Sequence, residues 1–179
     1  MAKAVPIHKL TRPDAPFIDS ASVIQVRLGE VMEFAPAALD PANVTELHDM
    51  RIAAKRLRYT LEVFTPVLPK ERAEPVLKMV AVLQEHLGAI HDNDMLVPLL
   101  AQALAREETR ERKKALRKKA ELPPFFAAEG LVPLISRKQA ERVILYNAFI
   151  AWWQALPPEA FWRQVSDVVP VDNAGSPQG

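Results

Sequence analysis

Apolar residues recur every three or four positions along one stretch of the chain, and this spacing fits only one regular structure. The positions are Leu47, Met50, Ala54, Leu57, Leu61 and Phe64. A helix with 3.6 residues per turn places all of them on one face, which must be buried against other elements. Asn43 and Glu46 precede the stripe in the spacing of a capping box, and Pro66 and Pro69 follow it. We therefore expect a helix from Asn43 to about Thr65.

Four further segments show the same spacing, each bounded by proline, glycine or a residue that can cap a helix. These segments are residues 19–35, 71–87, 93–120 and 133–156. Gly88 is expected to end one of these helices, and Asp92 to cap the next. Strand-type alternation of Val, Ile and Thr is nearly absent. The sequence therefore predicts an all-α protein, an antiparallel bundle of about four to six helices.

Both ends of the chain lack this periodicity. Residues 1–17 contain three prolines, which predicts a flexible N-terminal arm. Residues 164–179 are rich in small and polar types, which predicts a disordered C-terminal tail. The helical domain is then expected over residues 18–163, and a chain of 179 residues suits one domain.

Charge and composition narrow the classes of function. The formal net charge is only +1, so any anion binding must come from local clustering of cations. The chain has no cysteine, which excludes disulfides, thiolate metal sites and a cysteine nucleophile. No apolar stretch approaches the ~20 residues of a membrane span, and the first residues do not resemble a signal peptide. We expect a cytoplasmic protein without a membrane partner.

A line of basic residues follows the apolar stripe of the helix expected at 43–65. His48, Arg51, Lys55 and Arg58 fall within an arc of roughly 80°, and Glu62 is the only acid among them. Donors spaced at about 5 Å along a rigid rod suit an extended polyanion. Arg56 points in another direction and is the weaker candidate. The alternative is a solvated shoulder whose Arg and Lys stems cover the core edge.

Two more groups of cations are candidates for a second wall of such a site. They are Arg106, Arg110, Lys113 and Arg117 in the segment 93–120, and Lys138 and Arg142 in the last helix. The first group also fits a solvated helix with local glutamate pairs, and the second fits an ion pair at one end of the bundle.

A pair of aspartates could either bind a metal ion or stabilise the start of a helix. Asp92 and Asp94 follow His91 and could bind a metal. We prefer Asp92 as a helix cap and Asp94 as a first-turn residue that suits the helix dipole. Either carboxylate could also orient an arginine of the helix at 43–65. No metal or other cofactor is expected.

Two motifs resemble those of a known family. Residues 47–64, LHDMRIAAKRLRYTLEVF, resemble the signature helix of the CHAD family, the conserved-histidine α-helical domains. Residues 83–96, LQEHLGAIHDNDML, resemble its second motif, and the resemblance covers about residues 19–156. It places the family's histidine at His48, whereas His91 stands where the family usually has an arginine. The family's basic positions correspond to Arg51, Lys55, Arg56 and Arg58.

The resemblance implies a helical fold whose basic groove binds inorganic polyphosphate, often at polyphosphate granules. Many members carry two related four-helix bundles, and this chain has room for little more than one. A second groove wall would then come from the last helix, from the charged segment at 106–119, or from another copy in a homo-oligomer.

The leading hypothesis is non-catalytic binding of polyphosphate, for which other polyanions would compete. The enzyme alternative is a metal-dependent phosphohydrolase acting on a phosphorylated substrate, with His91, Asp92, His48 and His86 as its ligands. A third hypothesis is a generic RNA-binding or protein-binding helical module.

Overall fold

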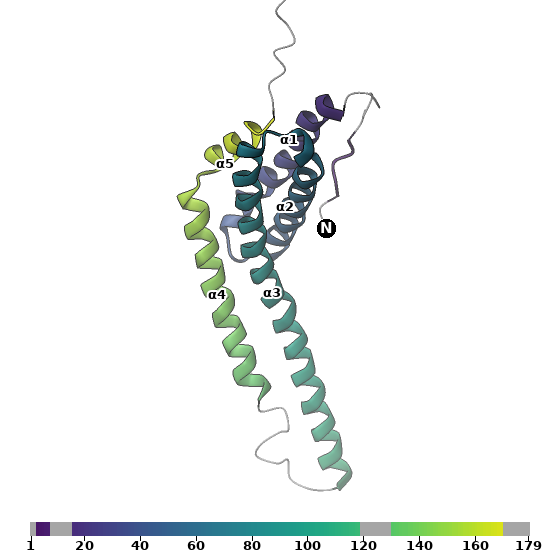
Figure 1. Cartoon of the computed structure of the whole chain (residues 1–179). Coiled ribbons are helices and arrows are strands. Elements are labelled where there is room, and N and C mark those ends of the chain that lie inside the picture. The colour runs from purple at the N-terminus through teal and green to yellow at the C-terminus, as the bar shows by residue number, and fades with distance from the viewer. Residues whose placement is uncertain (1–2, 8–15, 119–129, 170–179) are drawn as a thin grey trace, which may run out of the picture. The chain divides into compact units, whose positions relative to one another are not determined.

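A computed structural model of the chain describes residues 3–7, 16–118 and 130–169. Within these ranges all regular structure is helical, which confirms the predicted all-α bundle. Two 3-10 turns, Ala37–Leu39 and Thr65–Val67, join the first three helices (Figure 1). The five helices are α1 Pro16–Phe34, α2 Val44–Phe64, α3 Lys70–Lys118, α4 Leu131–Ala155 and α5 Pro158–Ser166. None of these helices is both long enough and apolar enough to cross a membrane.

The chain divides into two compact units, which are described separately. The first unit comprises Met1–Gly88 and Phe149–Gly179, and the second comprises Ala89–Ala148. The first unit thus holds α1, α2, α5, the start of α3 and the end of α4. The second unit holds the remainder of α3 and α4.

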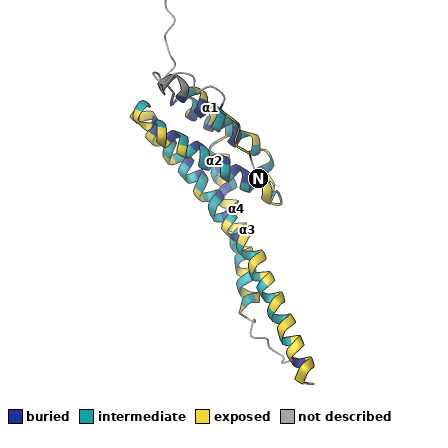
Figure 2. Ribbon diagram, turned by 90° about the vertical axis from the view of Figure 1, so that its right-hand side faces the viewer, coloured by how far each residue is buried: buried dark blue, intermediate teal, exposed yellow. Residues whose placement is uncertain are grey.

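The first unit contains most of the core. Helices α1 and α2 lie side by side, and buried residues gather along them (Figure 2). An aromatic cluster joins α4 to α5, with the Trp153 ring centroid 5.4 Å from that of Phe161 and 6.2 Å from that of Phe149. All three rings are almost fully buried. The predicted stripe of α2 is buried at Leu47, Met50, Ala54, Leu57 and Leu61.

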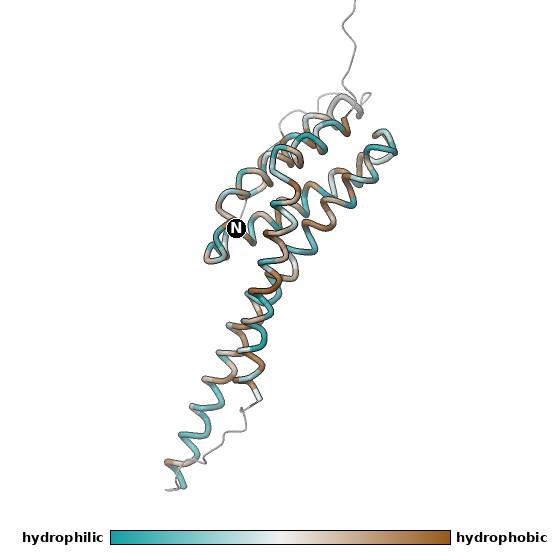
Figure 3. The backbone as a smooth tube through the Cα atoms, turned by 90° about the vertical axis from the view of Figure 1, so that its left-hand side faces the viewer, coloured by the Kyte–Doolittle hydropathy of each residue, from teal (hydrophilic) through white to brown (hydrophobic). Residues whose placement is uncertain are grey.

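The second unit is a pair of helices with few buried side chains. Among its described residues only Ile90, Asn93, Ala115 and Tyr146 are buried. The last turns of α3 are mostly hydrophilic (Figure 3). Arg142 on α4 and Asp94 on α3 link the two helices by an ion pair of 2.5 Å.

The predicted break between Gly88 and Asp92 is wrong, because α3 is continuous from Lys70 to Lys118. Asp92 is therefore not a helix cap but an exposed residue in the helix interior. A single glycine in a helix carries only a modest cost, so favourable neighbours on both sides can extend the helix through it. Asp94 also lies far from the first turn of its helix.

Two expectations about helix starts also differ from the structure. Asn43 is the N-cap residue of α2, but its side chain makes no capping hydrogen bond. Its Nδ2 instead donates to the Ala37 carbonyl oxygen over 2.9 Å, so the capping box does not form. Helix α1 begins at Pro16, three residues before the expected start of the segment 19–35.

The packed structure extends into both predicted flexible ends. Helix α5 was not predicted, and Val165, Val168 and Val169 are buried although the tail was expected from residue 164. In the N-terminal arm, the Val5 amide donates to Glu30 on α1 over 2.6 Å. The rest of the predicted tail, residues 170–179, lies outside the described residues, as do residues 1–2 and 8–15 of the arm.

Candidate anion-binding face

The basic residues of α2 lie between its buried face and its exposed face. His48, Arg51, Lys55 and Arg58 are all half-buried, with their side chains at the edge of the core. This position follows from the helical spacing, because each is three or four residues from the next and beside the apolar stripe. The structure therefore brings these four predicted residues together along one edge of α2.

Arg51 and Lys55 are the two cations of this edge that lack an acidic partner among the described residues. The Nε of Arg51 is buried and makes no hydrogen bond. The Lys55 ammonium lies 5.6 Å from the ring centroid of Tyr59, a cation–π contact that leaves its charge uncompensated by a carboxylate. Two adjacent turns of α2 thus carry positive charge that no carboxylate of the described residues neutralises by an ion pair.

Arg58 is held at the same edge by two neighbours. Its Nε donates to Glu62 Oε1 over 2.8 Å, and its Nη1 donates to Gln84 Oε1 of α3 over 3.4 Å. The pair with Glu62 is more than a third exposed on both sides, so it contributes at most about 1 kcal/mol. An anion of higher charge can therefore compete with Glu62 for this guanidinium.

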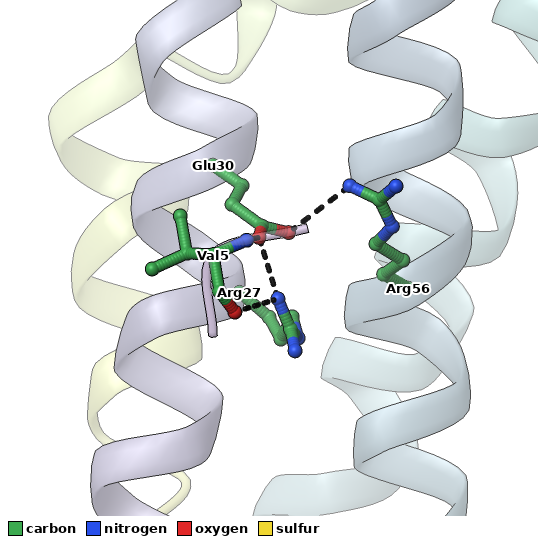
Figure 4. Close-up of polar contacts among 4 residues, drawn as sticks. All are labelled: Val5, Arg27, Glu30 and Arg56. Atoms are coloured by element: carbon green, nitrogen blue, oxygen red, sulfur yellow. Dashed lines mark hydrogen bonds and ion pairs between the residues drawn. The ribbon is translucent and has the colours of Figure 1, made fainter. Parts of the chain in front are cut away.

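Arg56 lies apart from this edge and contacts α1 instead (Figure 4). Its Nη1 is 3.8 Å from Glu30 Oε2, and the Glu30 side chain is only 4% exposed. The other Glu30 oxygen accepts hydrogen bonds from Arg27 Nη1 over 2.5 Å and from the Val5 amide. Arg56 thus compensates a buried carboxylate between two helices, a role that the sequence analysis did not predict.

The candidates for a second wall are all in the second unit. Lys138 donates to Glu141 over 2.7 Å, and this hydrogen bond lowers the pKa of the Glu141 carboxyl. Arg142 is paired with Asp94, so the arginine that Asp94 holds belongs to α4 and not to α2. The other candidates, Arg106, Arg110, Lys113 and Arg117, are exposed along the end of α3.

The ligands considered for a metal do not form a cluster. Within the described ranges no group of three or more His, Cys, Asp or Glu side chains is placed to hold a metal ion. His86 packs instead on aromatic rings, 5.5 Å from Trp152 and 6.4 Å from Phe149 between ring centroids. Burial lowers the pKa of His86 below its ordinary value, although the nearby Glu85 acts in the opposite direction.

Comparison with known proteins gives one match. The family model of the CHAD domain matches residues 9–101, which is more than half of the chain and includes all of α2. No curated protein and no solved structure matches the chain. The matched region contains the basic edge of α2 and both motifs noted in the sequence, and the chain belongs to the CHAD domain family.

Proposed function

We propose that this protein binds inorganic polyphosphate, without catalysis, through the edge of α2 formed by His48, Arg51, Lys55 and Arg58. The observation that carries the proposal is that Arg51 and Lys55, in adjacent turns, form no ion pair with a carboxylate of the described residues. Membership of the CHAD family supports the proposal, because CHAD domains in general bind polyphosphate.

The state of Arg51 favours an anionic ligand over bulk solvent. A buried polar nitrogen without a partner costs about 1–3 kcal/mol, because it has lost its water and gained nothing. A phosphate oxygen would supply the missing acceptor in a charge-assisted hydrogen bond. Adjustment of the arginine side chain would bring its remaining donors to the same ligand.

The geometry of a helix edge suits a repeating ligand. Successive cations at three-residue and four-residue spacing rise by roughly 5 Å along the axis. A linear polyanion offers charge at every repeat, so it can contact several of them at once and release counterions. A single phosphate ion would contact only one or two of these cations, so we expect the site to prefer polymers.

The enzyme alternative receives less support from the described residues. A metal-dependent phosphohydrolase needs several ligands that converge on one ion. His86 is packed on aromatic rings, and Asp92 is exposed on the outside of α3. We therefore propose a binding protein and not an enzyme.

RNA is the second candidate ligand, and one observation favours it. Tyr59 is 50% exposed beside Lys55, so a single aromatic ring accompanies the basic edge. One ring gives a poor platform for successive bases, which need repeated stacking partners. Polyphosphate needs no stacking and remains the better fit. We also propose that the protein is cytoplasmic, at polyphosphate granules or free of them, and that a second copy can complete the groove.

The proposal is tested by binding of labelled long-chain polyphosphate to the purified full chain over a salt series. Unlabelled polyphosphate, tRNA and heparin serve as competitors. We expect polyphosphate to displace the label at far lower charge concentration than the other two. Equal displacement by all three would reduce the site to a generic basic surface. Release of phosphate in the presence of Mg²⁺ or Mn²⁺ would favour the enzyme alternative.

A further inference from the structure

The end of α3 carries a second basic surface that the α2 site does not include. Arg106, Arg110, Lys113 and Arg117 follow one another at four-residue and three-residue spacing, so they share one face of the helix. All four are exposed. Together they extend over roughly 16 Å of helix. We call this set the distal stripe.

The distal stripe also borders a hollow of about 590 Å³. Its lining consists of cations together with one threonine, Thr109, and contains no acid among the described residues. The Thr109 hydroxyl donates to the Ala105 carbonyl over 2.8 Å, so its proton is engaged within the helix. The cations that line the hollow are Arg106, Arg110, Lys113, Lys114, Arg117 and Lys118.

The acids of this segment are on other faces of α3. Helical spacing places Glu107, Glu108 and Glu111 on faces of α3 away from the middle of the stripe. Glu107 reaches Arg110 at 3.5 Å, a pair in which the arginine is 74% exposed and therefore weakly bound. Glu111 pairs with Lys114 at 3.5 Å.

Three members of the distal stripe form no ion pair with a described residue. Within residues 70–118 and the other described ranges, Arg106, Lys113 and Arg117 pair with no carboxylate. Like charges at such spacing repel one another and weaken the helix that carries them. A bound polyanion would remove this repulsion, whereas a second copy of the stripe would add to it. The chemistry therefore fits a linear polyanion.

We propose that the distal stripe is a second binding surface for polyphosphate, which only long chains use together with the edge of α2. The inference rests on the proposed function, because it concerns the same ligand. A polymer already held at one surface meets the other at high effective concentration, so its affinity increases without any new contact at the first surface. Short chains that contact one surface gain nothing. The protein thereby selects polyphosphate by length.

The test compares two triple variants of the full chain with equal changes in charge. The first is Arg106→Gln with Lys113→Gln and Arg117→Gln, in which glutamine preserves helix propensity. The control is Lys70→Gln with Lys78→Gln and Arg163→Gln, three exposed cations of the first unit. Circular dichroism confirms the helix content of both. Binding is measured with chains of about ten phosphates and of several hundred, each over a salt series.

We expect the distal variant to lose at least about tenfold in affinity for long chains and little for short ones. For long chains, the slope of log affinity against log salt concentration should become shallower by about 2. Each lost phosphate contact removes about 0.7 from this slope for a single-stranded polyanion, and the variant loses three cations. Hydrogen exchange of residues 103–118 should slow when long chains bind the unchanged protein, and this protection should be lost in the variant.

Three other outcomes are distinguishable. Equal losses in the distal variant and its control, or equal losses for short and long chains, would overturn length selection by the distal stripe. If Arg51→Ala with Lys55→Ala abolishes binding of all lengths while the distal variant is unaffected, only the further inference fails. If the Arg51 and Lys55 variant is unaffected and the distal variant loses binding, the proposed α2 site is wrong.

Discussion

Arg56 of α2 faces Glu30 of α1, with Nη1 of the arginine 3.8 Å from Oε2 of the glutamate (Figure 4). The Glu30 side chain is only 4% exposed, so its negative charge requires compensation by nearby cations. Arg51 and Lys55 on the same helix form no ion pair with a carboxylate of the described residues. Arg56 therefore compensates a charge within the fold, whereas Arg51 and Lys55 are the cations of α2 that we propose for ligand binding.

This division predicts opposite effects for two single substitutions. Arg56→Ala should lower the free energy of unfolding by about 1–3 kcal/mol, because the buried Glu30 carboxylate loses one of its two ion pairs. Arg27 still pairs with the other oxygen, which limits the loss. Polyphosphate affinity of the folded variant should change little. Urea denaturation gives the first quantity, and binding below the transition gives the second.

The matched substitution is Arg51→Ala. It should lower polyphosphate affinity and leave stability nearly unchanged, since Arg51 forms no hydrogen bond or ion pair with a described residue. A large loss of affinity in Arg56→Ala together with unchanged stability would contradict the assignment of Arg56 to the fold.

Glu62 restrains Arg58, so removing its charge should improve binding. Glu62→Gln takes a negative charge from the basic edge and frees the Arg58 guanidinium from a pair of 2.8 Å. We expect polyphosphate affinity to rise by a few fold at low salt, with a smaller gain at high salt, because exposed charges are screened. Stability should fall by at most about 1 kcal/mol, as for an exposed pair. An unchanged or weaker affinity would show that Arg58 does not contact the ligand.

Asp94 and Arg142 should depend on each other for their contribution to stability. The two side chains are 8% and 17% exposed, so removal of either leaves an uncompensated charge in the second unit. Arg142→Met should lower stability by about 3 kcal/mol, whereas the double variant with Asp94→Leu should lose much less. A double-mutant cycle measured by chemical denaturation tests this. Additive losses in the cycle would mean that the pair is not coupled.

The lowered pKa of His86 predicts that the stability of the folded protein depends on pH. Because burial lowers its pKa in the folded state, the unfolded chain binds the proton more readily. The contribution of His86 to the free energy of unfolding is fully present above the ordinary imidazole pKa of 6.5. It is lost as pH falls through 6.5 towards the lowered pKa of the folded state. His86→Phe, which keeps an aromatic ring against Trp152, should flatten this part of the profile. An identical slope in both proteins between pH 7 and 5 would refute the role of His86.

The fold class and the site helix could be predicted because they depend on local patterns. The stripe from Leu47 to Leu61 fixes the buried face of α2 through its spacing alone, and the basic edge follows from the same geometry. The continuous α3 could not be predicted in this way. Gly88 and Asp92 are ordinary end signals, and neither shows whether the neighbouring turns supply enough stability to extend the helix.

Contacts between distant segments were also beyond the sequence analysis. Arg58 meets Gln84 across 26 positions, and Arg142 meets Asp94 across 48, so both depend on packing between helices. Glu30 offered a weak signal, because an acid that falls on the apolar side of an amphipathic helix needs a buried partner. That signal could have assigned Arg56 to the fold.

The proposed binding of polyphosphate by Arg51 and Lys55 of α2 is tested most directly by one comparison. Long-chain polyphosphate is titrated into Arg51→Ala with Lys55→Ala and into Lys70→Ala with Lys78→Ala, two variants with the same change in charge. We predict at least about a tenfold loss of affinity, or about 1.4 kcal/mol, in the first and a small change in the second. Equal affinities of the two variants, both folded, would contradict the claim.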